Sequence, residues 1–168
     1  MSVLFSVLLI FISFILQSSV FSHFEVAGIV PNLLIIVTAS LSVMHGERRG
    51  LIVGFFCGLL LDIFCGGLLG FYAFIMMMIG FINGKFYGIF YPEEIKLPLA
   101  LIFVSDLTYG IVIYITLFLL KGRFDFGYYF LKIIIPECLY TMVVTFVFYP
   151  LILKIDTLIS GRDQRGDY

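Results

Sequence analysis

The chain has 168 residues, of which 62% are hydrophobic and only 12% are charged, and its mean hydropathy is +1.16. A soluble domain of this size cannot bury so much apolar surface, so the composition excludes a soluble globular protein and predicts a membrane protein. The formal net charge of −1 also argues against a nucleic-acid-binding protein, because nucleic-acid binding needs a basic surface.

Long apolar runs predict a single all-α membrane domain over residues 1–168, a bundle of six transmembrane helices, since one crossing takes about 20 residues. We expect the first run to remain as an uncleaved helix, because no Lys or Arg precedes it as in a signal peptide. The second and third runs are short, which favours little tilt or local thinning of the bilayer. The expected spans cover residues 3–21, 30–44, 51–64, 69–87, 97–120 and 129–155.

Proline, glycine and charged residues mark the breaks between these runs. Pro31 is expected in the first turn of the second span, and the polar residues from His45 to Gly50 are expected to form a link between the second and third spans.

The basic residues predict the orientation of the chain, because cytoplasmic loops of membrane proteins are enriched in Lys and Arg. Both termini are expected in the cytoplasm, since this orientation puts most of the basic residues inside. The residues placed inside are Arg48, Arg49, Lys85, Lys96, Lys154, Arg162 and Arg165, and those placed outside are Lys121, Arg123 and Lys132.

Three acidic residues, Asp62, Asp106 and Glu137, fall inside predicted spans. Ionisable groups in the hydrocarbon layer are costly and normally face a protein interior, pair with another group and mark function. Counting helix rise from the expected span starts puts all three near mid-depth, at one polar level. Helix spacing suggests Gly110 as a neighbour of Asp106, and Thr141 and Thr145 as neighbours of Glu137. Two interpretations stay open: the acids serve a function, or they only join helices by hydrogen bonds.

Glycines recur every fourth residue through the third span and again in the fourth. Rows of small residues at this spacing let helix backbones approach closely. We expect this row to be either a helix-packing seam within the chain or a groove that receives a partner's helix. Its members include Gly54, Gly58, Gly66, Gly70, Gly80 and Gly84.

Catalytic and metal chemistry find little support in the sequence. The cysteines Cys57, Cys65 and Cys138 lack metal-ligand spacing and are expected to be small apolar side chains. Neither histidine falls inside an apolar span, so a serine-type intramembrane protease has no base for its nucleophile. An aspartyl protease built on Asp62 and Asp106 would lack the Gly-x-Gly-Asp pattern of that family. We therefore expect no catalytic residue, no metal site and no cofactor.

Several of these residues resemble the rod shape-determining protein MreD family of bacteria. The likeness runs over Gln17, Pro31-Asn32-Leu33-Leu34, Gly54, Gly58, Leu61-Asp62, Leu69-Gly70, Gly80 and Gly84. The resemblance implies a non-enzymatic, multi-pass subunit of the inner membrane that acts as a scaffold in the rod complex, or elongasome. Implied partners are MreC, the actin-like MreB, the glycosyltransferase RodA and its transpeptidase, and membrane lipid. The implied role couples the cytoskeleton to peptidoglycan synthesis and so supports cell shape.

The same family is similar in fold to the six-helix substrate-binding subunits of energy-coupling-factor vitamin transporters. The alternative function is therefore substrate capture for such a transporter, with the acids lining a cavity. Against this alternative, no two alanines of the chain stand four residues apart, whereas the transporter subunits often carry an Ala-x-x-x-Ala docking signature.

Overall fold

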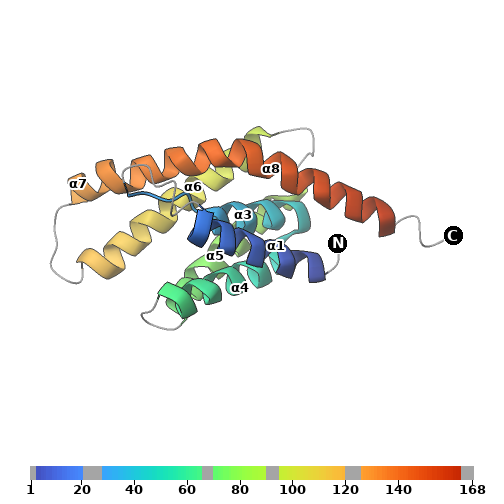
Figure 1. Ribbon diagram of the computed structural model, residues 1–168, viewed down its shortest axis with the longest axis horizontal. Coiled ribbons are helices and arrows are strands. Elements are labelled where there is room, and N and C mark those ends of the chain that lie inside the picture. The colour runs from blue at the N-terminus through green and yellow to red at the C-terminus, as the bar shows by residue number, and fades with distance from the viewer. Residues whose placement is uncertain (1–2, 21–27, 66–69, 90–94, 120–125, 164–168) are drawn as a thin grey trace.

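A computed structural model of the chain describes residues 3–20, 28–65, 70–89, 95–119 and 126–163, and these residues form an all-helical bundle (Figure 1). Six helical segments contain most of the described residues, and each overlaps one of the six expected spans. The segments are α1 (Val3–Ile15) with the π-helix Leu16–Val20, α3 (Leu33–His45), α4 (Glu47–Cys65), α5 (Phe71–Gly84) with the 3-10 helix Lys85–Ile89, α6 (Lys96–Ile113) with the π-helix Tyr114–Leu119, and α7 (Phe126–Tyr129) with the π-helix Phe130–Ile134 and α8 (Ile135–Asp163).

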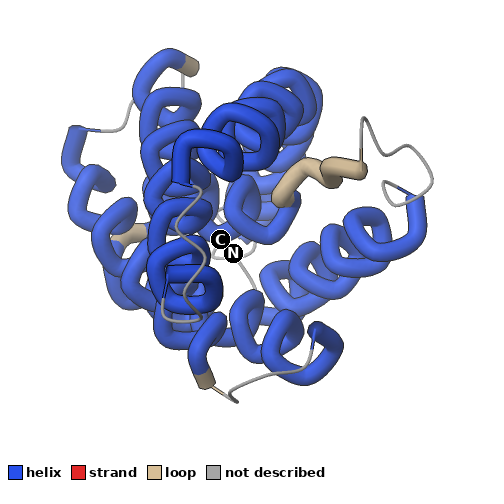
Figure 2. Tube along the Cα trace, turned by 90° about the vertical axis from the view of Figure 1, so that its left-hand side faces the viewer, coloured by secondary structure: helices blue, strands red, loops and turns tan. Residues whose placement is uncertain are grey.

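Helix α3 is the centre of the bundle. Every residue from Leu33 to Met44 is buried, and the helix contacts α1, α4, α5, α6 and α8 (Figure 1, Figure 2). Its sequence explains the position, because a helix that is apolar on every side from Leu33 to Met44, with only small hydroxyl side chains among the polar residues of that stretch, has no face suited to water. The other helices therefore pack around α3.

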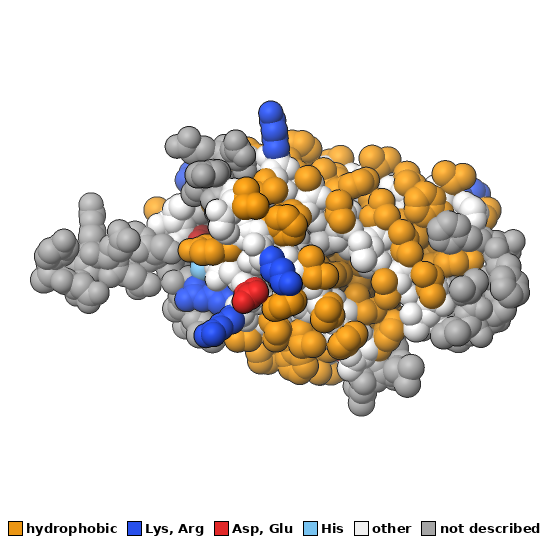
Figure 3. Space-filling view, turned by 180° about the vertical axis from the view of Figure 1, so that it is seen from behind, with side chains coloured by type: hydrophobic (Ala, Val, Ile, Leu, Met, Phe, Trp, Pro, Cys, Tyr) orange, Lys and Arg blue, Asp and Glu red, His pale blue; other side chains and the backbone are white. Residues whose placement is uncertain are grey.

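The outer surface of the bundle is apolar. Three helices, Phe71–Ile89, Lys96–Thr116 and Gly127–Leu158, are long and apolar enough to cross a membrane. Large apolar side chains remain exposed on them, among them Phe74 and Val147, which are 60% and 68% exposed. Hydrophobic side chains cover much of the face shown in Figure 3. Exposed apolar surface on this scale indicates a membrane environment.

Two expected details at the two ends of the second span are wrong. The residues from His45 to Gly50 do not form a polar link, because α3 runs to His45 and α4 begins at Glu47, which leaves only Gly46 between them. Gly46 has φ of +88°, a left-handed conformation that glycine adopts without strain. Pro31 lies before the first turn of α3, since Asn32 is the cap residue of that helix.

Most described charged residues gather at one end of the bundle, which we call the charged end (Figure 3). Helices α3, α5 and α8 finish there, and α4 and α6 begin there. His45 Nε2 lies 3.3 Å from Asp156 Oδ1, so the end of α3 is joined to the last turns of α8. The charged end includes His45, Glu47, Arg48, Arg49, Lys85, Lys96, Lys154 and Asp156.

Candidate functional site

Helices α4 and α5 pack with their backbones in contact along the glycine row. A Cβ atom on Gly54 would collide with the Met76 carbonyl group, and one on Gly80 would collide with the Gly50 carbonyl group. The contact residues advance by about four along α4 while their partners on α5 go back by about four. The two helices are therefore antiparallel with a fixed register. The close approaches are Gly58 to Tyr72 and Ala73, Gly54 to Met76, Gly50 to Gly80, and Gly84 to Glu47.

The glycine row is thus filled by a neighbouring helix of the same chain. We call this contact between α4 and α5 the glycine seam; its glycines are Gly50, Gly54, Gly58, Gly80 and Gly84. Of the two expectations for it, packing within the chain is the one that fits these contacts, and the row on α4 offers no free groove to a partner's helix along Gly50, Gly54 and Gly58. Gly70 has a different use, because its φ of +95° makes the turn that starts α5. Gly66 lies outside the described residues.

Asp62 caps the start of α5. Its carboxylate is buried, with 4% of the residue exposed, and it accepts three backbone hydrogen bonds. Oδ1 accepts from the N–H of Tyr72, and Oδ2 accepts from the N–H groups of Gly70 and Ala73, each at 3.0 Å. The first N–H groups of a helix have no partner within the helix and carry a partial positive charge. A carboxylate at this position therefore satisfies them and is itself stabilised.

The expected level of Asp62 was counted from a span start at residue 51. Helix α4 begins at Glu47 and ends at Cys65, so Asp62 lies in its last turn. The glycine seam brings that turn against the start of α5. Asp62 is therefore a capping residue at the end opposite the charged end.

The buried start of α3 is capped in a related way by side chains from three parts of the chain. Asn32 Oδ1 accepts from the N–H of Ile35 at 3.3 Å, and Gln17 Oε1 accepts from the N–H of Leu34 at 3.2 Å. Thr141 Oγ1 on α8 accepts from the N–H of Asn32 at 3.1 Å. These bonds join the first and last helical segments to the central helix. The contacts of Gln17 and Thr141 with the start of α3 were not expected from the sequence. The only signal for them is that these polar residues stand alone within apolar runs.

Asp106 and Glu137 lie across the interface between α6 and α8, close enough for their charges to interact. Asp106 is 2% exposed and faces the side chains of Thr141 and Cys138. Among the described residues, neither of its carboxyl oxygens makes a hydrogen bond of good geometry, although the Thr141 and Cys138 side chains lie close enough to interact with it. Glu137 is only partly buried. The structure thus brings these two acids together, whereas Asp62 is engaged separately at the start of α5.

The two threonines expected as neighbours of Glu137 make hydrogen bonds to other groups. Thr141 was expected beside Glu137, but its hydroxyl group accepts from Asn32 and faces Asp106. Thr145 bonds within its own helix, where its hydroxyl donates to the Thr141 carbonyl at 2.6 Å. Sequence reasoning also missed a contact between α5 and α6, in which Asn83 Nδ2 donates to Ser105 Oγ at 2.7 Å. A side chain's partner on another helix depends on helix rotation, which spacing within one helix does not give.

Two of the three cysteines have side chains in the described part of the structure. Cys57 and Cys138 are buried free thiols, and the side chain of Cys65 lies outside the described part of the structure. Within the described residues, no three His, Cys, Asp or Glu side chains are grouped so that they could hold a metal ion. The polar side chains described above, such as Asp62 and Thr141, bond to backbone N–H groups at the starts of other helices.

These features define the class of the molecule: a helical membrane protein whose helices are joined by a glycine seam and by buried polar contacts. The family model described as rod shape-determining protein MreD matches residues 1–156. The chain therefore belongs to the MreD family, whose members are membrane proteins of the rod shape-determining system. No curated protein and no solved structure matches the chain.

The glycine seam predicts a sharp difference between two glycines of the same helical segment. We expect Gly80→Ala to lower the free energy of unfolding by about 3 kcal/mol, because its Cβ would press on the backbone of α4. For a chain of this length, that loss lowers Tm by roughly 6–12 °C. Gly88→Ala is the matched control, since nothing lies within 4 Å of a Cβ at that position. Thermal unfolding of the purified variants in detergent measures both, and equal Tm values would contradict the seam.

The capping of α5 predicts different consequences for two buried acids. Asp62→Asn should lower the free energy of unfolding by about 2 kcal/mol, because one acceptor oxygen becomes an amide that cannot accept. Asp106→Asn should change it by no more than about 1 kcal/mol, since the described residues make no hydrogen bond of good geometry to that carboxyl group. The measurement is again Tm in detergent. A larger decrease in Tm for Asp106→Asn than for Asp62→Asn would contradict this prediction, because it would show that Asp106 contributes more to the stability of the fold.

Proposed function

We propose that this chain is a non-enzymatic, multi-pass subunit of the bacterial inner membrane that binds MreC and helps couple the cytoskeleton to peptidoglycan synthesis. Membership of the MreD family is the observation that carries this proposal. The proposed wider partners are MreB, RodA and its transpeptidase in the elongation complex. The apolar outer surface supports a role within the bilayer, where such a subunit would meet the membrane helices of its partners.

A scaffold role also suits what the polar residues do. Asp62, Gln17, Asn32 and Thr141 bond to backbone groups at helix starts, and these contacts hold the bundle in one arrangement. We propose packing as the role of Asp62. Recognition of a polar group on a partner suits Glu137 better, because its side chain is only partly buried.

The alternative function, substrate capture for an energy-coupling-factor transporter, needs a cavity with polar groups that fix a ligand. The two hollows beside α1 are lined mainly by apolar side chains, and none of the three intramembrane acids lines them. A likeness of the six-helix arrangement to the transporter subunits remains a prediction, and it assigns no activity by itself.

Gentle purification from native membranes tests the proposed function directly. A tagged copy of the chain should recover MreC, together with RodA and its transpeptidase, as identified by mass spectrometry. An unrelated polytopic membrane protein with the same tag is the control and should not recover them. Recovery of an ATPase pair with a coupling subunit instead would contradict the proposal and favour the transporter.

The proposed orientation, with both termini in the cytoplasm, predicts which surface residues a reagent reaches from outside the cell. Lys132, on the π-helix before α8, is far from the charged end, whereas Arg48 belongs to it. A cysteine at Lys132→Cys should react with a membrane-impermeant maleimide on intact spheroplasts. A cysteine at Arg48→Cys should react only after the membrane is opened. The reverse pattern would show that the charged end faces outward.

A further inference from the structure

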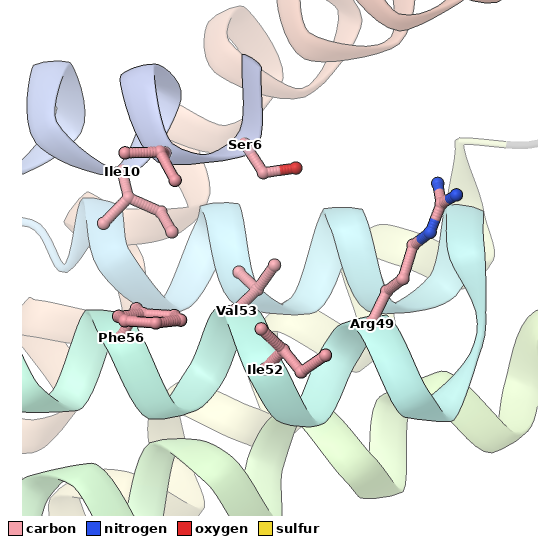
Figure 4. A pocket seen from close by; sticks show the side chains of 7 residues that line it. Ser6, Ile10, Arg49, Ile52, Val53 and Phe56 are labelled. Atoms are coloured by element: carbon pink, nitrogen blue, oxygen red, sulfur yellow. The ribbon is translucent and has the colours of Figure 1, made fainter. Parts of the chain in front are cut away.

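A trough runs between α1 and α4 on the surface of the bundle. It consists of two hollows of about 120 and 250 Å³, which share Val7, Ile10 and Phe56 as lining residues. One hollow extends to Ser6 and Arg49, and the other to Leu60 and neighbouring apolar side chains. Figure 4 shows the first hollow, with Ser6 and Ile10 on α1 facing Val53 and Phe56 on α4. We call this feature the α1–α4 trough.

The trough opens sideways to the surroundings of the bundle, because side chains on both of its walls are exposed. Val7 on α1 is 39% exposed and Phe56 on α4 is 48% exposed. Since the outer surface at this level is apolar, the medium that reaches the trough is the hydrocarbon of the bilayer. The trough is therefore accessible to an acyl chain without any opening of the bundle.

One end of the trough carries a cation. Arg49 is the charged residue of its lining, and Figure 4 shows its guanidinium group near the end at which Ser6 lies. Arg49 is exposed and belongs to the charged end. It forms no ion pair with a carboxylate of the described residues. The trough thus combines an apolar channel with a guanidinium group that has no carboxylate partner among the described residues. Such a combination complements an anion attached to a hydrocarbon chain.

The length of the trough identifies the kind of occupant. From Arg49 to Leu60, α4 rises about 16 Å, roughly half of the 30 Å hydrocarbon core of a bilayer. Beyond that level the rings of Phe14 on α1 and Phe64 on α4 close the gap, with centroids 4.8 Å apart. The trough is therefore one leaflet deep. A transmembrane helix of a partner protein would need a groove along the whole crossing, whereas a lipid tail needs only this length.

We propose that the α1–α4 trough is a binding site for one anionic phospholipid, with an acyl chain along Val7, Ile10 and Phe56 and the phosphate group at Arg49. Guanidinium groups suit phosphate because they donate two parallel hydrogen bonds. The Ser6 hydroxyl group lies at the same end of the trough and faces the headgroup region. A lipid held there fills the space between α1 and α4 and so fastens α1 to the rest of the bundle.

Native mass spectrometry of the purified full chain tests this site with phosphatidylglycerol and phosphatidylcholine of identical acyl chains. The chain should retain one phosphatidylglycerol in preference to phosphatidylcholine. Arg49→Gln should reduce this preference about tenfold, the loss expected for a charge-assisted hydrogen-bonded contact. Arg48→Gln is the matched control, because Arg48 is also exposed and adjacent but does not line the trough. Equal losses for the two variants would overturn the proposal, since they would reflect general surface charge.

A second pair of variants tests the channel itself. Val7→Trp should fill the trough and remove the retained phosphatidylglycerol, because Val7 lines both hollows. Leu8→Trp should leave it unchanged, since Leu8 is 52% exposed and does not line the trough. Retention of the lipid by both variants would overturn the proposed site. Loss of a copurified protein from Val7→Trp, with the lipid retained, would show that the trough receives a protein segment instead.

Discussion

A backbone N–H group that is buried away from water needs an acceptor, and in a membrane bundle that acceptor must come from the protein. Two helices of this chain begin with their first N–H groups facing other parts of the bundle. Asp62 accepts from three of them at the start of α5. Gln17, Asn32 and Thr141 serve the start of α3. Because Asp62, Gln17 and Thr141 sit on other segments than the helix starts they bond to, each cap also fixes how the segments are placed.

The cap on α5 and the glycine seam depend on one another. Gly58 allows α4 to lie against Tyr72 and Ala73, and Asp62 follows one helical turn later on α4. That register brings its carboxylate within reach of the first N–H groups of α5. A slip of the seam by one residue would turn the carboxylate away and leave both the acid and the N–H groups without partners. The carboxylate therefore makes one register much more favourable than its neighbours.

The amino-acid sequence predicts the helical segments well because apolar run length and glycine spacing are local properties. The number of helical segments and the tendency of the third and fourth segments to pack closely follow from them. The partners of polar side chains do not, since they depend on how each helix is rotated in the bundle. Thr141 shows the difference, because helix spacing assigned it to Glu137 while the fold turns it toward Asn32 and Asp106. The level of Asp62 was counted from residue 51, where the apolar run begins, whereas α4 begins at Glu47.

The two ends of the bundle carry different chemistry. At the end opposite the charged end, carboxylate and amide oxygens accept from helix starts, and these groups are satisfied within the chain. At the charged end, Arg49 is exposed and lacks a carboxylate partner among the described residues. Interactions that are complete within the chain hold the fold but leave nothing to bind another molecule. A guanidinium group without a carboxylate partner in the described part of the chain, beside an apolar trough, leaves a binding capacity that a phospholipid can satisfy. We therefore assign stability to the capped end, and contact with the surrounding membrane to the charged end.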